Sequence, residues 1–321
     1  MSGEGPALGA RLREGDLGAA PAALNLLEST APADRDEAAA LMRELAPGEL
    51  GAEAAGHVVG ITGPPGAGKS TLLSALIAAW RGRGRTVALL AVDPSSRRSG
   101  GSLLGDRARI EFDPADRGVL IRSTAAGERL GGIARPTRAA AEALAAAFDV
   151  VVIETVGVGQ AETEIADVAD TVAVVVQPGS GDVLQFLKSG IMEIPDVLVV
   201  TKADLGDLAM RTRRDLTAAL RSLGSRSTKV LAVSSLAPPS GIDELIDALE
   251  GHRDGLDVTA RRLAARRAGA LAEFAAEHGE RGLRALGGRA GAERLLAAQD
   301  PGLATAALIE VLEDALGEEA R

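Results

Sequence analysis

Short apolar runs rich in β-branched residues alternate with segments of helical periodicity between residues 56 and 250. Runs that are apolar at consecutive positions are typical of strands covered on both faces, as in a parallel sheet with crossover helices. The pattern therefore predicts an α/β domain with a mostly parallel central sheet. The predicted strands are HVVGITG, RTVALLAVD, GVLIRST, DVVVIET, DTVAVVVQPG, DVLVVTKAD and STKVLAVSS.

The two ends of the chain lack such runs and are rich in Ala, Leu, Glu and Arg. AALNLLEST and DRDEAAALMREL repeat apolar residues at spacings of three and four, which predicts two helices within residues 1–55. Residues 251–321 predict further helices, interrupted by glycine at ALGGRAGAE and QDPGLATAA. We therefore expect three parts: an N-terminal helical segment (1–55), the α/β domain (56–250) and a C-terminal helical segment (251–321).

Composition narrows the classes of partner and cofactor. The formal net charge is −10, so the phosphates of a nucleic acid would be repelled over most of the surface. The chain has no cysteine and three widely spaced histidines, which removes disulfides and the usual ligands of a transition-metal site. The sequence has no apolar segment typical of a signal peptide or a membrane span. We expect a cytoplasmic protein with neither a nucleic-acid nor a membrane partner.

The stretch GITGPPGAGKST lies between a predicted strand and a predicted helix. It matches the phosphate-binding P-loop pattern G-x-x-x-x-G-K-[ST], in which glycines let backbone N–H groups surround an anion at a helix N-terminus. Lys69 is expected to neutralise the β- and γ-phosphates of a nucleoside triphosphate, and Ser70 to bind Mg²⁺. The alternative is a glycine-rich turn that only joins strand to helix. The predicted nucleotide-binding residues of this stretch are Gly63, Pro64, Pro65, Gly66, Ala67, Gly68, Lys69, Ser70 and Thr71.

Carboxylates follow two other predicted strands. Asp93 ends RTVALLAVD, with Asp106 in the long polar loop behind it, and Glu154 ends DVVVIET ahead of Gly157. A carboxylate at a strand end beside a P-loop can hold Mg²⁺ or position the attacking water, and Gly157 can bring its N–H to the γ-phosphate. The alternative for Asp93 is to cap the turn before Pro94. The predicted catalytic residues are Lys69, Asp93 and Glu154, and the predicted metal-binding residues are Ser70, Asp93, Asp106 and Glu154.

The run DVLVVTKAD resembles the guanine-reading N-K-x-D element of GTPases, with Lys202 and Asp204 in place and Thr201 where Asn is usual. An aspartate accepts two hydrogen bonds from guanine, which adenine cannot supply, so the element favours GTP over ATP. The hydroxyl of Thr201 cannot reproduce the full hydrogen bonding of an Asn amide. The alternative is an ordinary surface turn. AVSSLAPPSGIDEL resembles the last guanine-contacting loop of such proteins, in which the N–H of the second residue faces the base O6; the corresponding residues are Ser234, Ser235 and Leu236.

Together with AVDPSSRRSGGSLLGDRARI, GGIARPTRAA, ETVGVGQAE and QPGSGDVLQFLKSGIMEIPD, these stretches closely resemble the MeaB family of G3E-type P-loop GTPases over residues 10–255. The resemblance implies a P-loop NTPase fold, slow turnover of GTP to GDP with Mg²⁺, and a homodimer formed through the helical C-terminal arm. It also implies an adenosylcobalamin-dependent acyl-CoA mutase as partner, whose cofactor loading the protein gates and which it protects from inactivation. Asp182, Gln185 and Lys188 would lie in a mobile switch, although Lys188 also fits an ordinary solvated lysine.

Two other functions stay open. An older family label, ArgK, describes a transport-associated ATPase or kinase for lysine, arginine and ornithine; it predicts ATP preference and a protein phosphoacceptor, which Asp204 disfavours. A nickel-inserting GTPase would share the P-loop, but its metal-binding Cys and His residues are missing. The stretch RSTAAGERLGG is looser than the Ser-rich loop of the MeaB family, and this departure bears on the identity of the partner.

Overall fold

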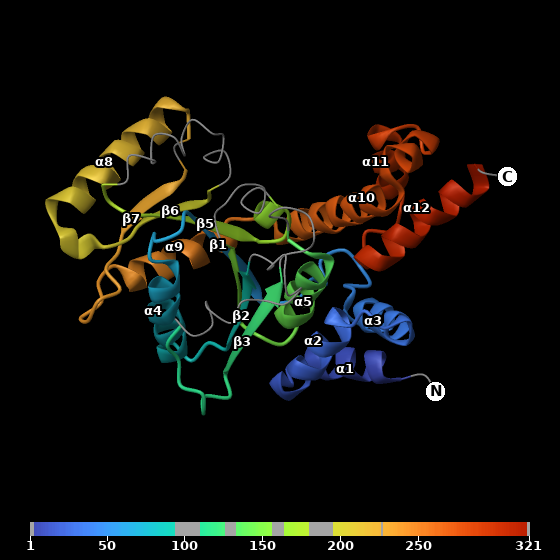
Figure 1. Cartoon of the computed structure of the whole chain (residues 1–321), viewed down its shortest axis with the longest axis horizontal. Coiled ribbons are helices and arrows are strands. Elements are labelled where there is room, and N and C mark those ends of the chain that lie inside the picture. Colours follow the sequence, from blue (N-terminus) through green and yellow to red (C-terminus); the bar gives the residue numbers. More distant parts are fainter. Residues whose placement is uncertain are drawn as a thin grey trace, which may run out of the picture. The chain divides into compact units, whose positions relative to one another are not determined.

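The computed structural model describes residues 3–93, 110–125, 133–155, 164–179, 195–225 and 227–319 (Figure 1). The chain divides into two compact units. The first, which we call the sheet unit, comprises Gly56–Thr137 and Phe148–Leu256. The second, which we call the helical unit, comprises Met1–Ala55, Arg138–Ala147 and Asp257–Arg321. Among the described residues, no helix is both long enough and apolar enough to span a membrane.

A seven-stranded sheet forms the centre of the sheet unit, with strand order β3-β2-β4-β1-β5-β6-β7. Every pairing between these strands in the described structure is parallel. Each apolar run predicted as a strand is one, so the prediction of a mostly parallel α/β sheet is confirmed. The strands are β1 (His57–Thr62), β2 (Val87–Asp93), β3 (Val119–Ala125), β4 (Val150–Thr155), β5 (Thr171–Val176), β6 (Val197–Val200) and β7 (Lys229–Ala232).

The register brings the carboxyl ends of the strands to one edge of the sheet. Ile61 of β1 lies beside Glu154 of β4, and Val92 of β2 lies beside Thr155. On the other side of β1, Val176 of β5 is paired with Val200 of β6. Because parallel strands all end at the same edge, the loops that follow them meet there, where ligands of such sheets bind.

Helices pack against the sheet through large apolar side chains. One buried cluster joins Trp80 and neighbouring apolar residues of α4 to Leu245 and Leu249 of α9 and to the strand residues Val152 and Val175. Trp80 is only 1% exposed, so this face of the sheet is closed to water. Among the described residues of this unit, the helices are α4 (Lys69–Gly82), α8 (Asp207–Ser222) and α9 (Ile242–Asp254), with the short 3-10 helices η3 (Ile165–Asp167) and η5 (Ala203–Leu205).

The helical unit is built from the two ends of the chain and part of α5. Its C-terminal helices share a core in which Phe274 and Leu312 are completely buried. Glycines interrupt the helices after Ala285 and before Arg289, as ALGGRAGAE predicted. The elements are α1 (Glu4–Arg13), η1 (Leu17–Ala19), α2 (Ala20–Glu28), α3 (Pro32–Leu45), α5 (Arg135–Ala145), α10 (Val258–Ala285), α11 (Arg289–Ala297) and α12 (Thr305–Glu319).

Helix α1 is an element that the sequence pattern did not predict. Its sequence EGPALGARLR holds two glycines, which lower intrinsic helix propensity. In the structure both glycines face α3: a Cβ at Gly5 would collide with the carbonyl oxygen of Glu37, and one at Gly9 would lie 2.9 Å from the Glu44 side chain. Close packing of α1 on α3 therefore favours glycine there, and tertiary contact outweighs local propensity.

Charged side chains are buried within the helical unit. Arg266 is 6% exposed and donates two hydrogen bonds to the carboxylate of Glu53, at 2.9 and 3.0 Å. It also donates to the carbonyl of Pro301 at 2.9 Å. Nearby, burial raises the pKa of Glu142 from 4.5 to about 7, and the positive charge of Arg266 offsets only part of this rise. Glu142 accepts a 3.4 Å hydrogen bond from the Thr305 hydroxyl.

The raised pKa of Glu142 predicts a pH-dependent effect of Glu142→Gln. Between pH 4.5 and about 7 the folded protein keeps a proton that the unfolded chain loses, so ionisation of Glu142 lowers stability as pH rises through this window. Glutamine removes this penalty, and we expect Glu142→Gln to raise the free energy of unfolding by up to about 3 kcal/mol at pH 8. At pH 4 the two proteins should be equally stable. Urea unfolding at both pH values measures the difference, with the exposed Glu310→Gln as control; an equal gain at both pH values would contradict the prediction.

Candidate nucleotide-binding site

The predicted P-loop connects β1 to α4 as its motif requires. Helix α4 begins at Lys69, and its N-cap is Gly68 with φ 90°, in the left-handed region. Because glycine has no side chain, Gly68 cannot cap the N–H groups of the first turn, and these can donate to an anion. Gly66 also has a positive φ, 77°. The loop is therefore curled as a phosphate-binding loop, with the positive end of the α4 dipole at its base.

Gly63 is the P-loop glycine with the strictest steric requirement. Its φ is 145°, and a Cβ there would collide with the backbone carbonyl oxygen of Val175 in the adjacent strand. We expect Gly63→Ala to lower the free energy of unfolding by about 3 kcal/mol or more, because backbone atoms on both sides must shift. Gly66→Ala is the matched control: its φ is also positive, but no atom lies within 4 Å of the added Cβ. The Gly66→Ala variant should lose only about 1–2 kcal/mol in free energy of unfolding. Chemical denaturation measures the free energy of unfolding of both variants. Equal losses would contradict the steric argument.

Lys69 lies folded over the loop that precedes it. Its Nζ donates to the carbonyl oxygen of Gly63 at 2.7 Å and to that of Pro64 at 3.3 Å, and the residue is 7% exposed. The loop thus holds a cationic side chain over its own backbone, at the start of the helix. This is the position from which a lysine neutralises phosphate oxygens. Ser70, the proposed Mg²⁺ ligand, follows in the first turn of α4.

Thr201 connects the predicted base-reading loop to the P-loop. Its hydroxyl lies 2.6 Å from the carbonyl oxygen of Ala67, to which it donates, and 3.2 Å from that of Val176, and the residue is 3% exposed. Lys202 adds a 3.4 Å hydrogen bond from its Nζ to the carbonyl of Gly66. The threonine that replaces the usual Asn therefore still holds the two loops together. The sequence showed that Thr201 lacks the amide of the usual Asn, but only the structure shows which carbonyl groups its hydroxyl contacts.

Asp204 and the last loop are joined by a side-chain hydrogen bond. The hydroxyl of Ser234 donates to Asp204 Oδ1 at 2.8 Å, and Ser234 is itself held by two backbone hydrogen bonds with Ser240. A carboxylate oriented in this way can accept hydrogen bonds from the N1 and N2 groups of guanine. Ser235 and Leu236 follow in the same loop, and Leu236 is 59% exposed, as a residue at the rim of a ligand site can be.

The two predicted carboxylates of the described strands lie on neighbouring strand ends. Glu154 is 5% exposed near the end of β4, directly beside Ile61 of β1 and hence close to the start of the P-loop. Asp93 is the last residue of β2, the strand on the other side of β4. Hydroxyl and carboxylate oxygens are the ligands that Mg²⁺ prefers, so Ser70, Asp93 and Glu154 fit that ion by their chemistry.

Five predicted residues lie outside the described part of the chain: Asp106, Gly157, Asp182, Gln185 and Lys188. Two features of the described site were not predicted. The buried hydroxyl of Thr155 donates to that of Thr62 at 2.9 Å, joining the ends of β4 and β1. Gln177, directly after β5, accepts a 2.5 Å hydrogen bond from Lys202 Nζ. Thr62, Thr155 and Gln177 are polar residues at strand ends, and this position was the signal that could have identified them.

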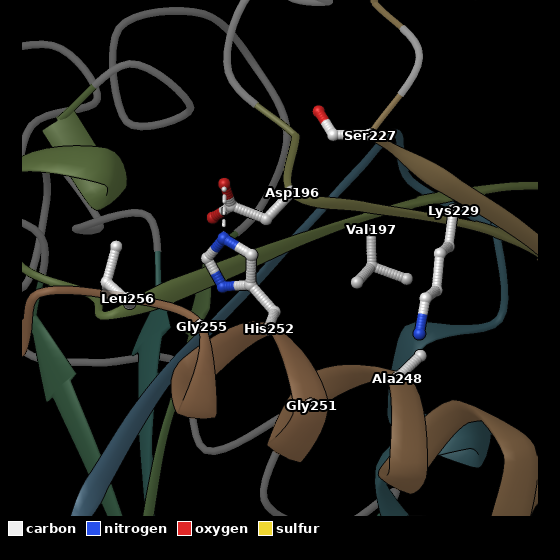
Figure 2. A pocket seen from close by; sticks show the side chains of 9 residues that line it. All are labelled: Asp196, Val197, Ser227, Lys229, Ala248, Gly251, His252, Gly255 and Leu256. Atoms are coloured by element: carbon white, nitrogen blue, oxygen red, sulfur yellow. Dashed lines mark ion pairs between the residues drawn. The ribbon is translucent and has the colours of Figure 1, made fainter.

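A separate cavity of about 260 Å³ lies beside the amino ends of β6 and β7 (Figure 2). His252 of α9 points into it with its Nε2 3.2 Å from Asp196 Oδ1, and its Nδ1 lies 2.9 Å from the Thr171 hydroxyl. The P-loop and the base-reading loop follow the carboxyl ends of their strands. The cavity therefore lies at the opposite edge of the sheet and does not belong to the candidate nucleotide site.

Comparison with known proteins places these features in a family. The model of the family described as "Methylmalonyl Co-A mutase-associated GTPase MeaB" matches residues 20–283. A Mycobacterium tuberculosis protein named "Probable GTPase" is 42% identical over 257 residues, covering 78% of this chain and 75% of that protein. A Caenorhabditis elegans protein named "Methylmalonic aciduria type A homolog, mitochondrial" is 37% identical over 256 residues, covering 74% of this chain and 63% of that protein.

The fold has a matching solved structure over nearly its whole length. A protein described as "LAO/AO transport system kinase" superposes with a TM-score of 0.66 and 28% identity, covering 98% of both chains. The family match spans well over half of the chain, and the P-loop and base-reading loop occupy one edge of a parallel sheet. The chain therefore belongs to the MeaB family of methylmalonyl Co-A mutase-associated GTPases.

Proposed function

We propose that this GTPase is a nucleotide-controlled chaperone of an adenosylcobalamin-dependent acyl-CoA mutase, whose cofactor loading it gates and which it protects from inactivation. The observation that carries the nucleotide part is the contact between the two loops: Thr201 donates to Ala67 of the P-loop, and Ser234 orients Asp204. A change at the phosphates can thus reach the base-reading loop through hydrogen bonds. The family description supports the mutase as partner.

The chain's own residues take defined parts in this proposal. Lys69 and the P-loop N–H groups bind the phosphates, Asp204 selects guanine, and Ser70 with Asp93 and Glu154 would hold Mg²⁺, which supplies charge neutralisation on the phosphates. Glu154 accepts a proton from the attacking water or orients it. If so, Glu154→Gln slows hydrolysis about 10²-fold while GDP affinity stays within a few fold. Single-turnover hydrolysis measures this effect. Unchanged turnover in Glu154→Gln would show that another residue, such as Asp93, acts on the attacking water.

Calorimetric titration tests the proposal as a whole. The protein is titrated with GDP, a non-hydrolysable GTP analogue and ATP in Mg²⁺, alone and with an adenosylcobalamin-dependent mutase from the same organism. Guanine-selective binding whose affinity changes with the mutase is the expected result, because coupling between two ligands is reciprocal. Guanine binding whose affinity does not change with the mutase would contradict the chaperone role but would still agree with a GTPase.

The solved structure described as a transport system kinase favours one second candidate, a kinase of a transport-associated protein. This function predicts preference for ATP and transfer of the γ-phosphate to a protein acceptor. The same titration separates the two functions, because Asp204 favours guanine over adenine. We propose in addition that the C-terminal helices form a homodimer interface, which sedimentation of the full chain and of a chain truncated before Val258 would test.

A further inference from the structure

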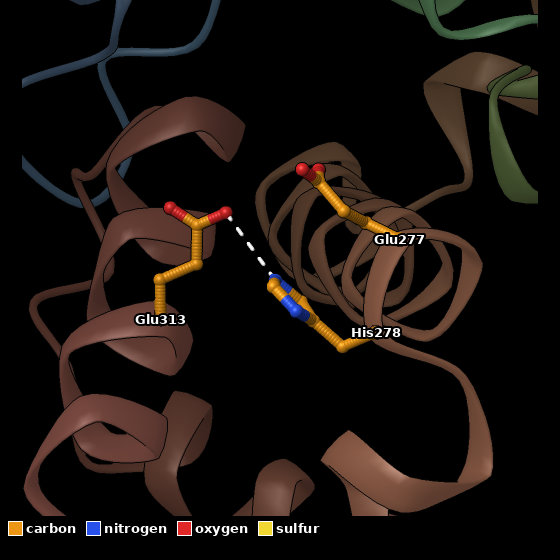
Figure 3. Close-up of side chains that lie close together, drawn as sticks. All are labelled: Glu277, His278 and Glu313. Atoms are coloured by element: carbon orange, nitrogen blue, oxygen red, sulfur yellow. Dashed lines mark ion pairs between the residues drawn. The ribbon is translucent and has the colours of Figure 1, made fainter. Parts of the chain in front are cut away.

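One imidazole and two carboxylates lie close together in the helical unit, outside the loops of the nucleotide site. Glu277 and His278 come from α10, and Glu313 comes from the neighbouring α12 (Figure 3). One potential ligand atom from each residue lies within 4.8 Å of the others. Glu277 and His278 are adjacent in the sequence, but Glu313 lies on a separate helix, so the sequence holds no short motif for this cluster.

The backbone and neighbouring side chains hold the His278 ring in place. Gly279 interrupts the helical conformation of α10 directly after His278, with φ 63° and ψ −166°. The imidazole packs on Phe274 with ring centroids 4.6 Å apart. Gly282, one turn further along, approaches so closely that a Cβ there would collide with the Cβ of His278. The ring is thus oriented before any ligand binds, which lowers the entropic cost of using it as a ligand.

The Nε2 atom of His278 points toward Glu313 but makes no hydrogen bond to it. The atom is buried and has no hydrogen-bond partner among the described residues. It lies 3.6 Å from Glu313 Oε1, beyond the usual range of a hydrogen bond. Zinc–nitrogen and zinc–oxygen bonds of about 2.0–2.2 Å place two tetrahedral ligands about 3.4 Å apart. The observed separation therefore suits two ligands of one ion better than a direct hydrogen bond.

We propose that Glu277, His278 and Glu313 bind a divalent first-row transition ion, with Zn²⁺ as the best fit, which cross-links α10 to α12. An imidazole with carboxylates is a donor set for zinc, and three protein ligands leave a fourth position for water. Mg²⁺ and Ca²⁺ fit less well because they prefer sites made of oxygen alone. The side chains of His278 and Glu313 are 27% and 42% exposed, so solvent reaches both residues although the Nε2 atom itself is buried.

Zinc titration of the full-length protein tests this site, with excess GDP and Mg²⁺ present so that the nucleotide site is occupied. Calorimetry should show one Zn²⁺ site, and Co²⁺ should give a visible absorption band in the same protein. His278→Ala and Glu313→Gln should each weaken Zn²⁺ binding at least about 100-fold. Loss of a residue that only hydrogen-bonds to a metal ligand already lowers metal affinity about 10–100-fold. Circular dichroism checks that each variant is folded.

The matched control is His252→Ala, because His252 is also an imidazole that is 27% exposed and lies beside a carboxylate, Asp196 (Figure 2). This variant should bind Zn²⁺ like the unaltered protein, and Zn²⁺ should raise its unfolding temperature equally. Loss of the thermal shift in His278→Ala and Glu313→Gln but not in His252→Ala supports the proposal. Absence of stoichiometric Zn²⁺ binding, or binding that survives His278→Ala, overturns the proposal.

Discussion

Replacing Lys69 with alanine is expected to weaken the binding of GDP and of a GTP analogue about 10²–10⁴-fold, since two charge-assisted hydrogen bonds to phosphate oxygens contribute about 1.5–3 kcal/mol each and 1.4 kcal/mol is tenfold. In the structure Lys69 Nζ lies 2.7 Å from the Gly63 carbonyl, over the predicted phosphate-binding loop. We expect the ammonium to exchange these backbone contacts for phosphate oxygens when nucleotide binds. Fluorescent-nucleotide titration or calorimetry measures the loss.

The matched control for this prediction is Lys229→Ala. Lys229 begins β7, at the amino end of the strands and hence at the edge of the sheet opposite the P-loop. The two variants make the same change of charge, so a general electrostatic effect would weaken binding in both. Only Lys69→Ala should lose affinity. Unchanged nucleotide affinity in Lys69→Ala would show that Lys69 does not bind the phosphates.

Replacing Asp204 with asparagine is expected to exchange guanine for xanthine as the preferred base. Aspartate accepts two hydrogen bonds from guanine, and an amide places a donor where guanine also donates. The loss of two charge-assisted bonds should weaken GDP binding about 10²–10⁴-fold. Xanthine carries a carbonyl in place of the exocyclic amine, so it can accept from the new amide, and XDP affinity should rise. Competition of GDP, XDP and ADP against a labelled nucleotide measures all three.

The contact between Ser234 and Asp204 supplies the control for base recognition. Ser234→Ala removes the 2.8 Å hydrogen bond that orients the carboxylate but keeps its charge. We expect this variant to lose about tenfold in GDP affinity, the value of one hydrogen bond, with guanine still preferred. An Asp204→Asn protein that keeps its preference for guanine would show that Asp204 does not contact the base.

Most of the sheet unit could be predicted from the sequence because its signals are local. Consecutive β-branched residues predicted each of the strands, and the glycines and Lys69 of one short stretch predicted the P-loop and the start of α4. A parallel sheet also requires its strand ends to meet at one edge, so polar residues after β6 and β7 could be assigned to the same site as the P-loop. Such rules depend only on neighbours in the chain and on strand direction.

The rest depended on distances between residues far apart in the chain. Thr201 is a weak substitute for Asn by its chemistry, and only the approach of the Ala67 carbonyl to 2.6 Å shows that it joins two loops. Helix α1 forms because its glycines fit against α3, against their own propensity.

Local sequence was enough to predict the parallel sheet and the position of the P-loop, which the structure confirms, because periodicity and motif spacing are properties of the local chain. The guanine-reading element stays a prediction from motif spacing. The tertiary structure alone decided the raised pKa of Glu142 and the meeting of His278 with Glu313. Both arise from desolvation and proximity between helices that are separate in the sequence. Burial and long-range contact are set by packing, which no local pattern specifies.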